Sequence, residues 1–161
     1  MDSAKLNDWL QVIGLFGVIA SLIFVGLQMK QDREIAMSAA YQARSSQISE
    51  IQTAMAGDPA MRGFFHKVDT GKLDEITPDE ANATVLYLGA VFNFYENVHY
   101  QYMNGFIDDE HWEKSRGGLK NMLYSDFARS IFLESIIPWR TSYQALAEEI
   151  IAEIDAEEAN K

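Results

Sequence analysis

The chain has 161 residues, of which 48% are hydrophobic, so it carries enough apolar surface for a packed core and wholesale disorder is excluded. Its formal net charge is −11, which argues against binding nucleic acid, because such binding depends on clustered Lys and Arg. The sequence has no cysteine, and this excludes disulfides, thiolate nucleophiles and zinc–thiolate sites.

An uncharged segment near the N-terminus organises the rest of the chain. Residues 10–27 include no charged side chain, and as a helix the segment from Trp9 to Met29 would be about 31 Å long. The hydrocarbon core of a bilayer is about 30 Å thick. The segment is longer than the apolar region of a secretory signal and has neither a basic leader nor a nearby cleavage site. We therefore predict a retained transmembrane helix at residues 9–29, after a tail at residues 1–8.

Basic residues flanking this helix indicate its orientation. Lys30, Arg33 and Arg44 follow the helix, whereas Lys5 is the one basic residue before it. Basic residues next to a membrane-spanning helix tend to stay in the cytoplasm. The sequence thus predicts a single-pass protein whose C-terminal domain is cytoplasmic.

Small residues recur within the predicted transmembrane helix. Gly17 and Ser21 form a small-xxx-small pair, with Gly14 one turn earlier, and such residues let two helices approach closely in lipid. They are also common in membrane helices that do not associate. We take Gly14, Gly17 and Ser21 as a candidate homo-oligomer interface, with an ordinary lipid-facing surface as the alternative.

Helix signals continue after the membrane, and no strand pattern separates them. No Pro or Gly interrupts residues 30–56, so the transmembrane helix is expected to continue as a juxtamembrane stalk. Gly57-Asp58-Pro59 then ends this helix and begins another. Residues 57–161 are expected to form a small bundle of four or five helices, so the predicted fold is all-α.

Start and stop signals place the first helices of this domain. A short helix is expected from Pro59 to about Val68, followed by a turn. Thr77-Pro78-Asp79-Glu80 has the pattern of a capping box, which opens a helix to about Asn104 with Gly105 as its stop. This helix carries an aromatic stripe, which could line a ligand pocket or simply form core: Tyr87, Phe92, Phe94, Tyr95, Tyr100 and Tyr102.

The later helices show both strong and weak signals. Asp108 is a predicted N-cap, with Ile107 and Trp112 at the positions of a hydrophobic staple. Gly117-Gly118 predicts a kink or break in that helix, and Ser125 restarts one. The last helix is expected at residues 141–156, with a frayed end, because acidic side chains oppose the helix dipole there.

Two segments, ASLIFVGLQMKQ and YENVHYQYMNGFIDDEHW, resemble a widespread group of uncharacterised bacterial single-pass membrane proteins, in which a SLxxxxxQ segment ends the span. The resemblance implies a helical protein of the inner membrane and implies no reaction. The positions that carry it are Ser21, Leu22, Gln28, Tyr95, Glu96, Asn97, Tyr100, Gln101, Tyr102, Gly105 and Trp112.

A metal site is the main chemical alternative. Glu96 and His99 form an E-x-x-H pair one helical turn apart, as in di-iron carboxylate bundles, and His111 could add a nitrogen ligand. Such a site needs a second E-x-x-H and further glutamates on facing helices, and the sequence has no second E-x-x-H. The competing interpretation is that His99 packs in the aromatic stripe while Glu96 bonds a neighbouring helix.

No nucleophile motif, phosphate-binding loop or dinucleotide fingerprint is present in the sequence. We therefore expect a non-catalytic, membrane-anchored protein without a cofactor, either a self-assembling scaffold or an accessory subunit of a membrane complex. Its expected partners are the lipid bilayer and further copies of itself. The alternative is an enzyme or sensor that binds a metal or small ligand near Glu96 and His99.

Overall fold

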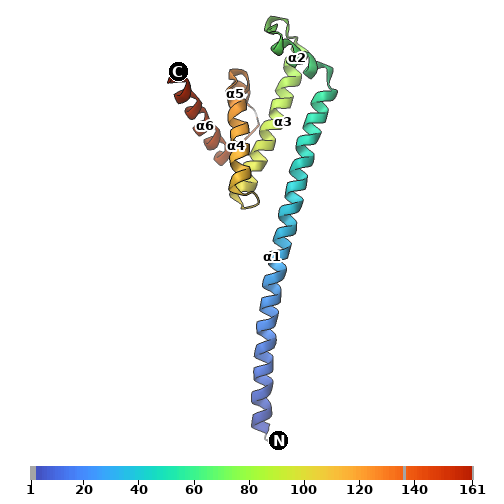
Figure 1. Ribbon diagram of the computed structural model, residues 1–161, viewed down its shortest axis with the longest axis vertical. Helices are drawn as coiled ribbons and strands as arrows, with labels where there is room; N and C mark the ends of the chain where they lie inside the picture. Colours follow the sequence, from blue (N-terminus) through green and yellow to red (C-terminus); the bar gives the residue numbers. More distant parts are fainter. Residues whose placement is uncertain (1–2, 136, 161) are drawn as a thin grey trace. The chain divides into compact units, whose positions relative to one another are not determined.

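The computed structural model describes residues 3–135 and 137–160, and the regular elements in these ranges are all helical (Figure 1). The all-α prediction, with one long N-terminal helix followed by shorter ones, is confirmed. In chain order the elements are α1 (Ser3–Gly57), α2 (Pro59–Asp69), the 3₁₀ helix η1 (Leu73–Glu75), α3 (Pro78–Met103), α4 (Asp109–Leu123), α5 (Asp126–Leu133) and α6 (Thr141–Ala159).

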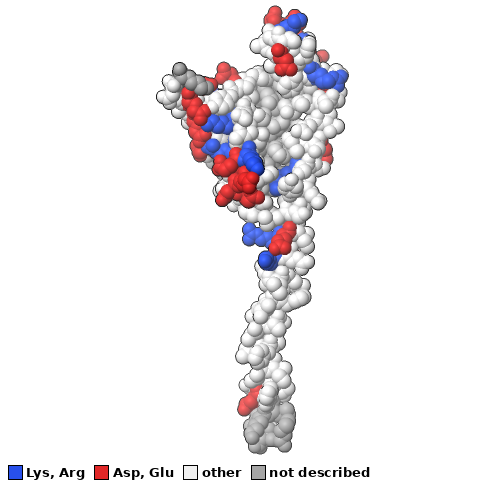
Figure 2. All heavy atoms as spheres, in the orientation of Figure 1, with Lys and Arg blue, Asp and Glu red and all other residues white. Residues whose placement is uncertain are grey.

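The chain divides into two compact units between Tyr41 and Gln42. The first unit contains the N-terminal part of α1, which begins at Ser3, so residues 3–8 of the predicted tail are helical, and residues 1 and 2 lie outside the described ranges. The large apolar side chains of residues 9–29 are all exposed, and Figure 2 shows a long stretch of this helix without charged atoms. By length and composition, α1 can cross a membrane.

The second unit begins inside α1 and contains the shorter helices. Residues 42–57 of α1 contribute side chains to it, since Gln47 accepts a hydrogen bond from Asn97 and Arg44 donates one to Gln101. At the predicted junction Asp58 is the N-cap of α2, and its carboxylate accepts a hydrogen bond from the Ala60 amide at 2.8 Å.

The predicted capping box at the start of α3 is present and also ties α3 to α2. The Glu80 carboxylate accepts a hydrogen bond from the Thr77 amide at 2.7 Å, while the Thr77 hydroxyl accepts one from the Glu80 amide at 3.3 Å. Lys67 of α2 donates to the same carboxylate at 2.7 Å. The Glu80 carboxylate occupies the space where a Cβ of residue 63 would lie, so Gly63 leaves room for this carboxylate between the two helices.

An aromatic core holds α3, α5 and α6 together. Phe92 is fully buried in an edge-to-face contact with Phe132, with ring centroids 5.2 Å apart, and Phe132 stacks on Trp139 at 5.6 Å. Tyr143 is also fully buried, and its hydroxyl donates to the Phe92 carbonyl at 3.0 Å. These contacts hold Trp139 in the core, shortly before the start of α6.

Of the predicted kink or break at Gly117-Gly118, the break is wrong, because α4 runs as one helix from Asp109 to Leu123. The reason for the second glycine lies in the packing. The Tyr95 hydroxyl oxygen is 2.5 Å from the position that a Cβ of residue 118 would occupy. Gly118 therefore makes room for a ring of α3, while the space around Gly117 is open.

The predicted boundary of the last helix at residue 156 is too early, because α6 continues to Ala159. Glu153 and Glu157 on its C-terminal half pair with two cations of α4. Lys120 donates to Glu157 at 2.7 Å and to Glu153 at 3.1 Å, and Arg116 bonds the same Glu153. The hydrogen bonds from Arg116 and Lys120 lower the pKa of Glu153, and that from Lys120 lowers the pKa of Glu157. Figure 2 shows these charges of both signs together over α4 and α6.

Two alanine substitutions in α4 test why its glycines are present. Gly117→Ala should raise the free energy of unfolding by about 1 kcal/mol, since alanine is the better helix former and nothing obstructs its methyl group. Gly118→Ala should lower this free energy, because its methyl group collides with Tyr95. Chemical unfolding of the full chain in detergent, followed by fluorescence, measures both changes.

The collision has its own control. Adding Tyr95→Phe to Gly118→Ala removes the hydroxyl that obstructs the methyl group, so the double variant should recover stability relative to Gly118→Ala alone. Equal gains from Gly117→Ala and Gly118→Ala would contradict the packing explanation.

The Glu80 contacts predict a pH dependence of stability. The Lys67 hydrogen bond and the Thr77 amide lower the pKa of Glu80 from 4.5 to about 2. Because the folded pKa is the lower one, the stabilisation is complete above about pH 4.5 and is lost as the pH falls toward 2. Glu80→Gln should therefore lower stability at neutral pH and flatten the decline between these values. A Glu80→Gln profile parallel to that of the wild type would contradict the assignment.

Candidate functional site

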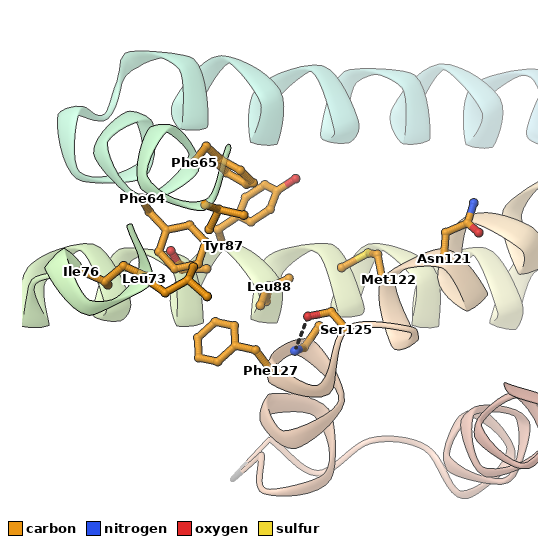
Figure 3. Close-up of a pocket in the computed structure, with 13 residues that line it drawn as sticks. Phe64, Phe65, Leu73, Ile76, Tyr87, Leu88, Asn121, Met122, Ser125 and Phe127 are labelled. Atoms are coloured by element: carbon orange, nitrogen blue, oxygen red, sulfur yellow. Dashed lines mark hydrogen bonds between the residues drawn. The ribbon is translucent and has the colours of Figure 1, made fainter. Parts of the chain in front are cut away.

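A pocket of about 650 Å³ opens in the second unit among α2, η1, α3, α4 and the start of α5 (Figure 3). This volume falls in the range of about 300–1,000 Å³ that is typical of small-molecule sites. The residues that line it are mainly apolar: Phe64, Phe65, Val68, Leu73, Ile76, Thr84, Tyr87, Leu88, Asn121, Met122, Ser125, Phe127 and Ala128.

Aromatic rings from three helices form one wall of the pocket. Phe64 of α2 stacks on Phe127 of α5, with ring centroids 6.0 Å apart, and contacts Phe65 edge to face at 5.6 Å. Phe65 in turn meets Tyr87 of α3 at 6.3 Å. The helical repeat explains these positions on α2, because Phe64 and Val68 are one turn apart on the same face.

Four polar side chains also line the pocket, and two of them are already engaged. Thr84 donates to the carbonyl of Glu80 at 2.8 Å, and the Ser125 hydroxyl accepts from the amide of Ala128 as the N-cap of α5. The Tyr87 hydroxyl and the Asn121 side-chain amide make no hydrogen bond to another described residue. These two groups are therefore available to a ligand.

Electrostatically the pocket is neutral. Its lining contains no Asp, Glu, Lys, Arg or His among the described residues. Burial raises the pKa of Tyr87, so its hydroxyl is protonated and can donate a hydrogen bond at neutral pH. The pocket thus favours a neutral, largely apolar ligand with a small polar group.

The predicted pair Glu96 and His99 lies on α3, away from this pocket. Glu96 accepts a hydrogen bond from the backbone amide of Arg140 at 2.7 Å, immediately before α6. The Arg140 guanidinium lies over the Tyr100 ring, 4.2 Å from its centroid. Glu96 therefore fixes the start of α6 to the central helix, a contact that supports the alternative in which this carboxylate bonds a neighbouring helix.

His99 is buried between two rings. The centroid of its imidazole lies 5.3 Å from the ring centroid of Trp112 and 6.1 Å from that of Tyr143. Burial lowers its pKa and the Glu96 charge partly opposes this shift, so the imidazole is neutral at physiological pH. His111 is near the start of α4. Across residues 3–135 and 137–160, no group of three or more His, Asp or Glu side chains is arranged to hold a metal ion.

The predicted interface residues Gly14, Gly17 and Ser21 lie on the first unit. No atom lies within 4 Å of the position that a Cβ would occupy at either glycine, and Ser21 is exposed. The surface around these small residues is therefore open to a neighbouring helix or to lipid.

The aromatic stripe of α3 divides between pocket and core. Tyr87 lines the pocket, whereas Phe92 is in the core and Tyr102 stacks on Trp112 at 4.7 Å. No pattern in the sequence indicates that Phe64, Asn121 and Phe127 line one pocket. The apolar spacing of α2 was a signal for a buried face, but no local pattern indicates that α2 and α5 meet.

The fold and the pocket define an all-α protein with one helix able to cross a membrane and a helical domain that contains a neutral pocket. No family model matches the chain, and the comparisons with curated proteins and with solved structures found no match.

Substitutions at Glu96 distinguish a structural role from metal binding. Glu96→Ala removes the acceptor for the Arg140 amide and should lower the free energy of unfolding by about 1–2 kcal/mol. Glu96→Gln keeps an oxygen acceptor and should retain most of the stability. Chemical unfolding measures both effects. Elemental analysis of protein purified without chelator is the control, because stoichiometric metal that both variants lose would contradict the structural role.

Proposed function

We propose that this chain is a non-catalytic, single-pass membrane protein that acts as a self-assembling scaffold or as an accessory subunit of a membrane complex. The observation that carries the proposal is the uncharged surface of α1 over residues 10–27, where the large apolar side chains are all exposed. A soluble monomer rarely exposes so extended an apolar surface, whereas a bilayer accommodates it.

The contacts of the helical domain support a structural role. Its prominent charged side chains connect helices to one another: Lys67 with Glu80 links α2 to α3, and Arg116 with Glu149 links α4 to α6. Glu96 fixes the start of α6. These charges stabilise the bundle that the membrane helix carries.

Self-assembly is supported by the small residues of the first unit. At about 100° per residue, Gly14, Gly17 and Ser21 fall within about 60° of one another around the helix axis. A second helix can approach closely there, because nothing in the described chain fills the space beside the two glycines.

The proposal places the protein in a bacterial inner membrane with its domain in the cytoplasm. Lys30 and Arg33 immediately after the apolar segment support this orientation. The resemblance of ASLIFVGLQMKQ to uncharacterised inner-membrane proteins supports the compartment.

A matched pair of glycine substitutions tests self-assembly. Gly17→Ile blocks close approach at the proposed interface and should reduce the particle mass of the full chain in mild detergent, measured by mass photometry or light scattering. Gly26→Ile makes the same chemical change about 150° away from that face and should leave the mass unchanged. A wild-type mass equal to one copy, or equal masses for both variants, would contradict self-assembly through this face.

Protease protection in sealed inverted vesicles tests the orientation. The helical domain should be digested from outside, because inversion exposes the cytoplasmic face. Protection of the domain would contradict the cytoplasmic placement.

Proteins that co-purify stoichiometrically in mild detergent would favour the accessory-subunit form of the proposal over the scaffold.

A further inference from the structure

We infer that the pocket among α2, α3, α4 and α5 is a binding site for an uncharged single-chain lipid. The inference gives the helical domain a ligand, which the proposed scaffold role does not require. It rests on the proposed membrane anchor only for the supply of that lipid.

The charge of the pocket lining favours an uncharged ligand. The described lining offers no cation to a phosphate or carboxylate and no anion to an amine. Placing an unpaired charge in an apolar pocket is costly, so the pocket discriminates against fatty-acid anions and phosphate-bearing lipids. An uncharged ligand meets no such penalty.

The shape of the pocket lining favours a ligand with one hydrocarbon chain. Phe64, Leu88 and Phe127 offer apolar surface toward one end of the pocket, and Asn121 lies at the other end beyond Met122 (Figure 3). A volume of about 650 Å³ suits one drug-sized or single-chain molecule. The hydrocarbon chain would lie against the rings of α2 and α5.

The available hydrogen-bonding groups specify the polar end. Asn121 has an amide that both donates and accepts, and Tyr87 has a protonated hydroxyl. Neither makes a hydrogen bond to another described residue, whereas Thr84 and Ser125 are engaged. A hydroxyl or ester group of the ligand would complete the hydrogen bonding of Asn121, whereas Tyr87 lies beside Phe65 at the aromatic end.

The proposed membrane anchor would keep the domain close to its lipid ligand. A domain tethered to a bilayer by its own helix meets lipids at a much higher effective concentration than a free protein does. A monoacylglycerol has the required chemistry, with one hydrocarbon chain and an uncharged, hydroxylated head.

Photolabelling of the full chain in phosphatidylcholine nanodiscs tests the inference. The probe is a monoacylglycerol with a photoreactive diazirine in its acyl chain, and mass spectrometry maps the labelled peptides. Label is expected on residues 59–76, 84–88 and 121–128, in addition to lipid contacts at residues 9–29.

Phe127→Glu places a charge in the pocket wall and should reduce pocket labelling by roughly tenfold. Leu133→Glu makes the same charge change on an exposed position of α5 outside the pocket lining, and labelling should be unchanged. Val68→Trp narrows the pocket without a charge and should also reduce labelling, which guards against unfolding by the glutamate. Near-ultraviolet circular dichroism checks that each variant is folded.

Two further measurements test the head group of the ligand. Asn121→Leu should weaken competition by unlabelled monoacylglycerol by roughly threefold, because one hydrogen bond is lost. A photoreactive fatty acid, ionised at pH 8, should label the pocket less than the monoacylglycerol does. Equal labelling by the two probes would overturn the assignment of an uncharged ligand.

The outcomes separate this inference from the proposed anchor. Label confined to residues 9–29 would overturn the lipid site and leave the anchor intact, whereas failure of the chain to enter nanodiscs would overturn the anchor. If Phe127→Glu lowered the particle mass while wild-type protein took up no pocket label, a second copy would cover the pocket and the lipid inference would be wrong.

Discussion

The main physical constraint on this protein is the apolar surface of α1, which the rest of the described chain does not cover. Over residues 10–27 every large apolar side chain of α1 is exposed, and each would gain about 1.5–3 kcal/mol by leaving water. The helical domain does not need this surface for folding, because it has its own aromatic core around Phe92 and Tyr143. A bilayer would remove this surface from water, and the helix itself pairs the backbone groups that lipid cannot bond. The proposed membrane anchor would therefore use the same apolar residues that a soluble fold would have to bury.

Within the domain, the long helix α3 connects the structural and the candidate functional features. Its first turn binds α2 through Glu80, its middle carries Phe92 into the core, and Glu96 holds the start of α6. The pocket lies beside the same helix, where Tyr87 and Leu88 face residues of α2 and α5. Glu96 bonds the chain before α6 and His99 packs between aromatic rings, and the neutral pocket lies elsewhere on α3.

Local signals predicted the helices well because their causes are local. The caps at Asp58, Thr77, Asp108 and Ser125 are present because each side chain bonds an amide two or three residues ahead. The two incorrect predictions depended on distant partners. Gly118 makes room for the Tyr95 ring of α3, and Lys120 of α4 pairs with Glu157 near the end of α6. The pocket was missed for the same reason, since Phe64 and Phe127 are far apart in the sequence.

The account depends most directly on the apolar helix residing in lipid. Membranes from cells that express the full chain can be washed with alkaline carbonate, which releases peripheral proteins, and then separated by centrifugation. We predict that the chain stays in the membrane pellet and is released by detergent. Recovery of the intact chain in the carbonate supernatant, or as a soluble protein after lysis without detergent, would contradict the anchor and with it the proposed role.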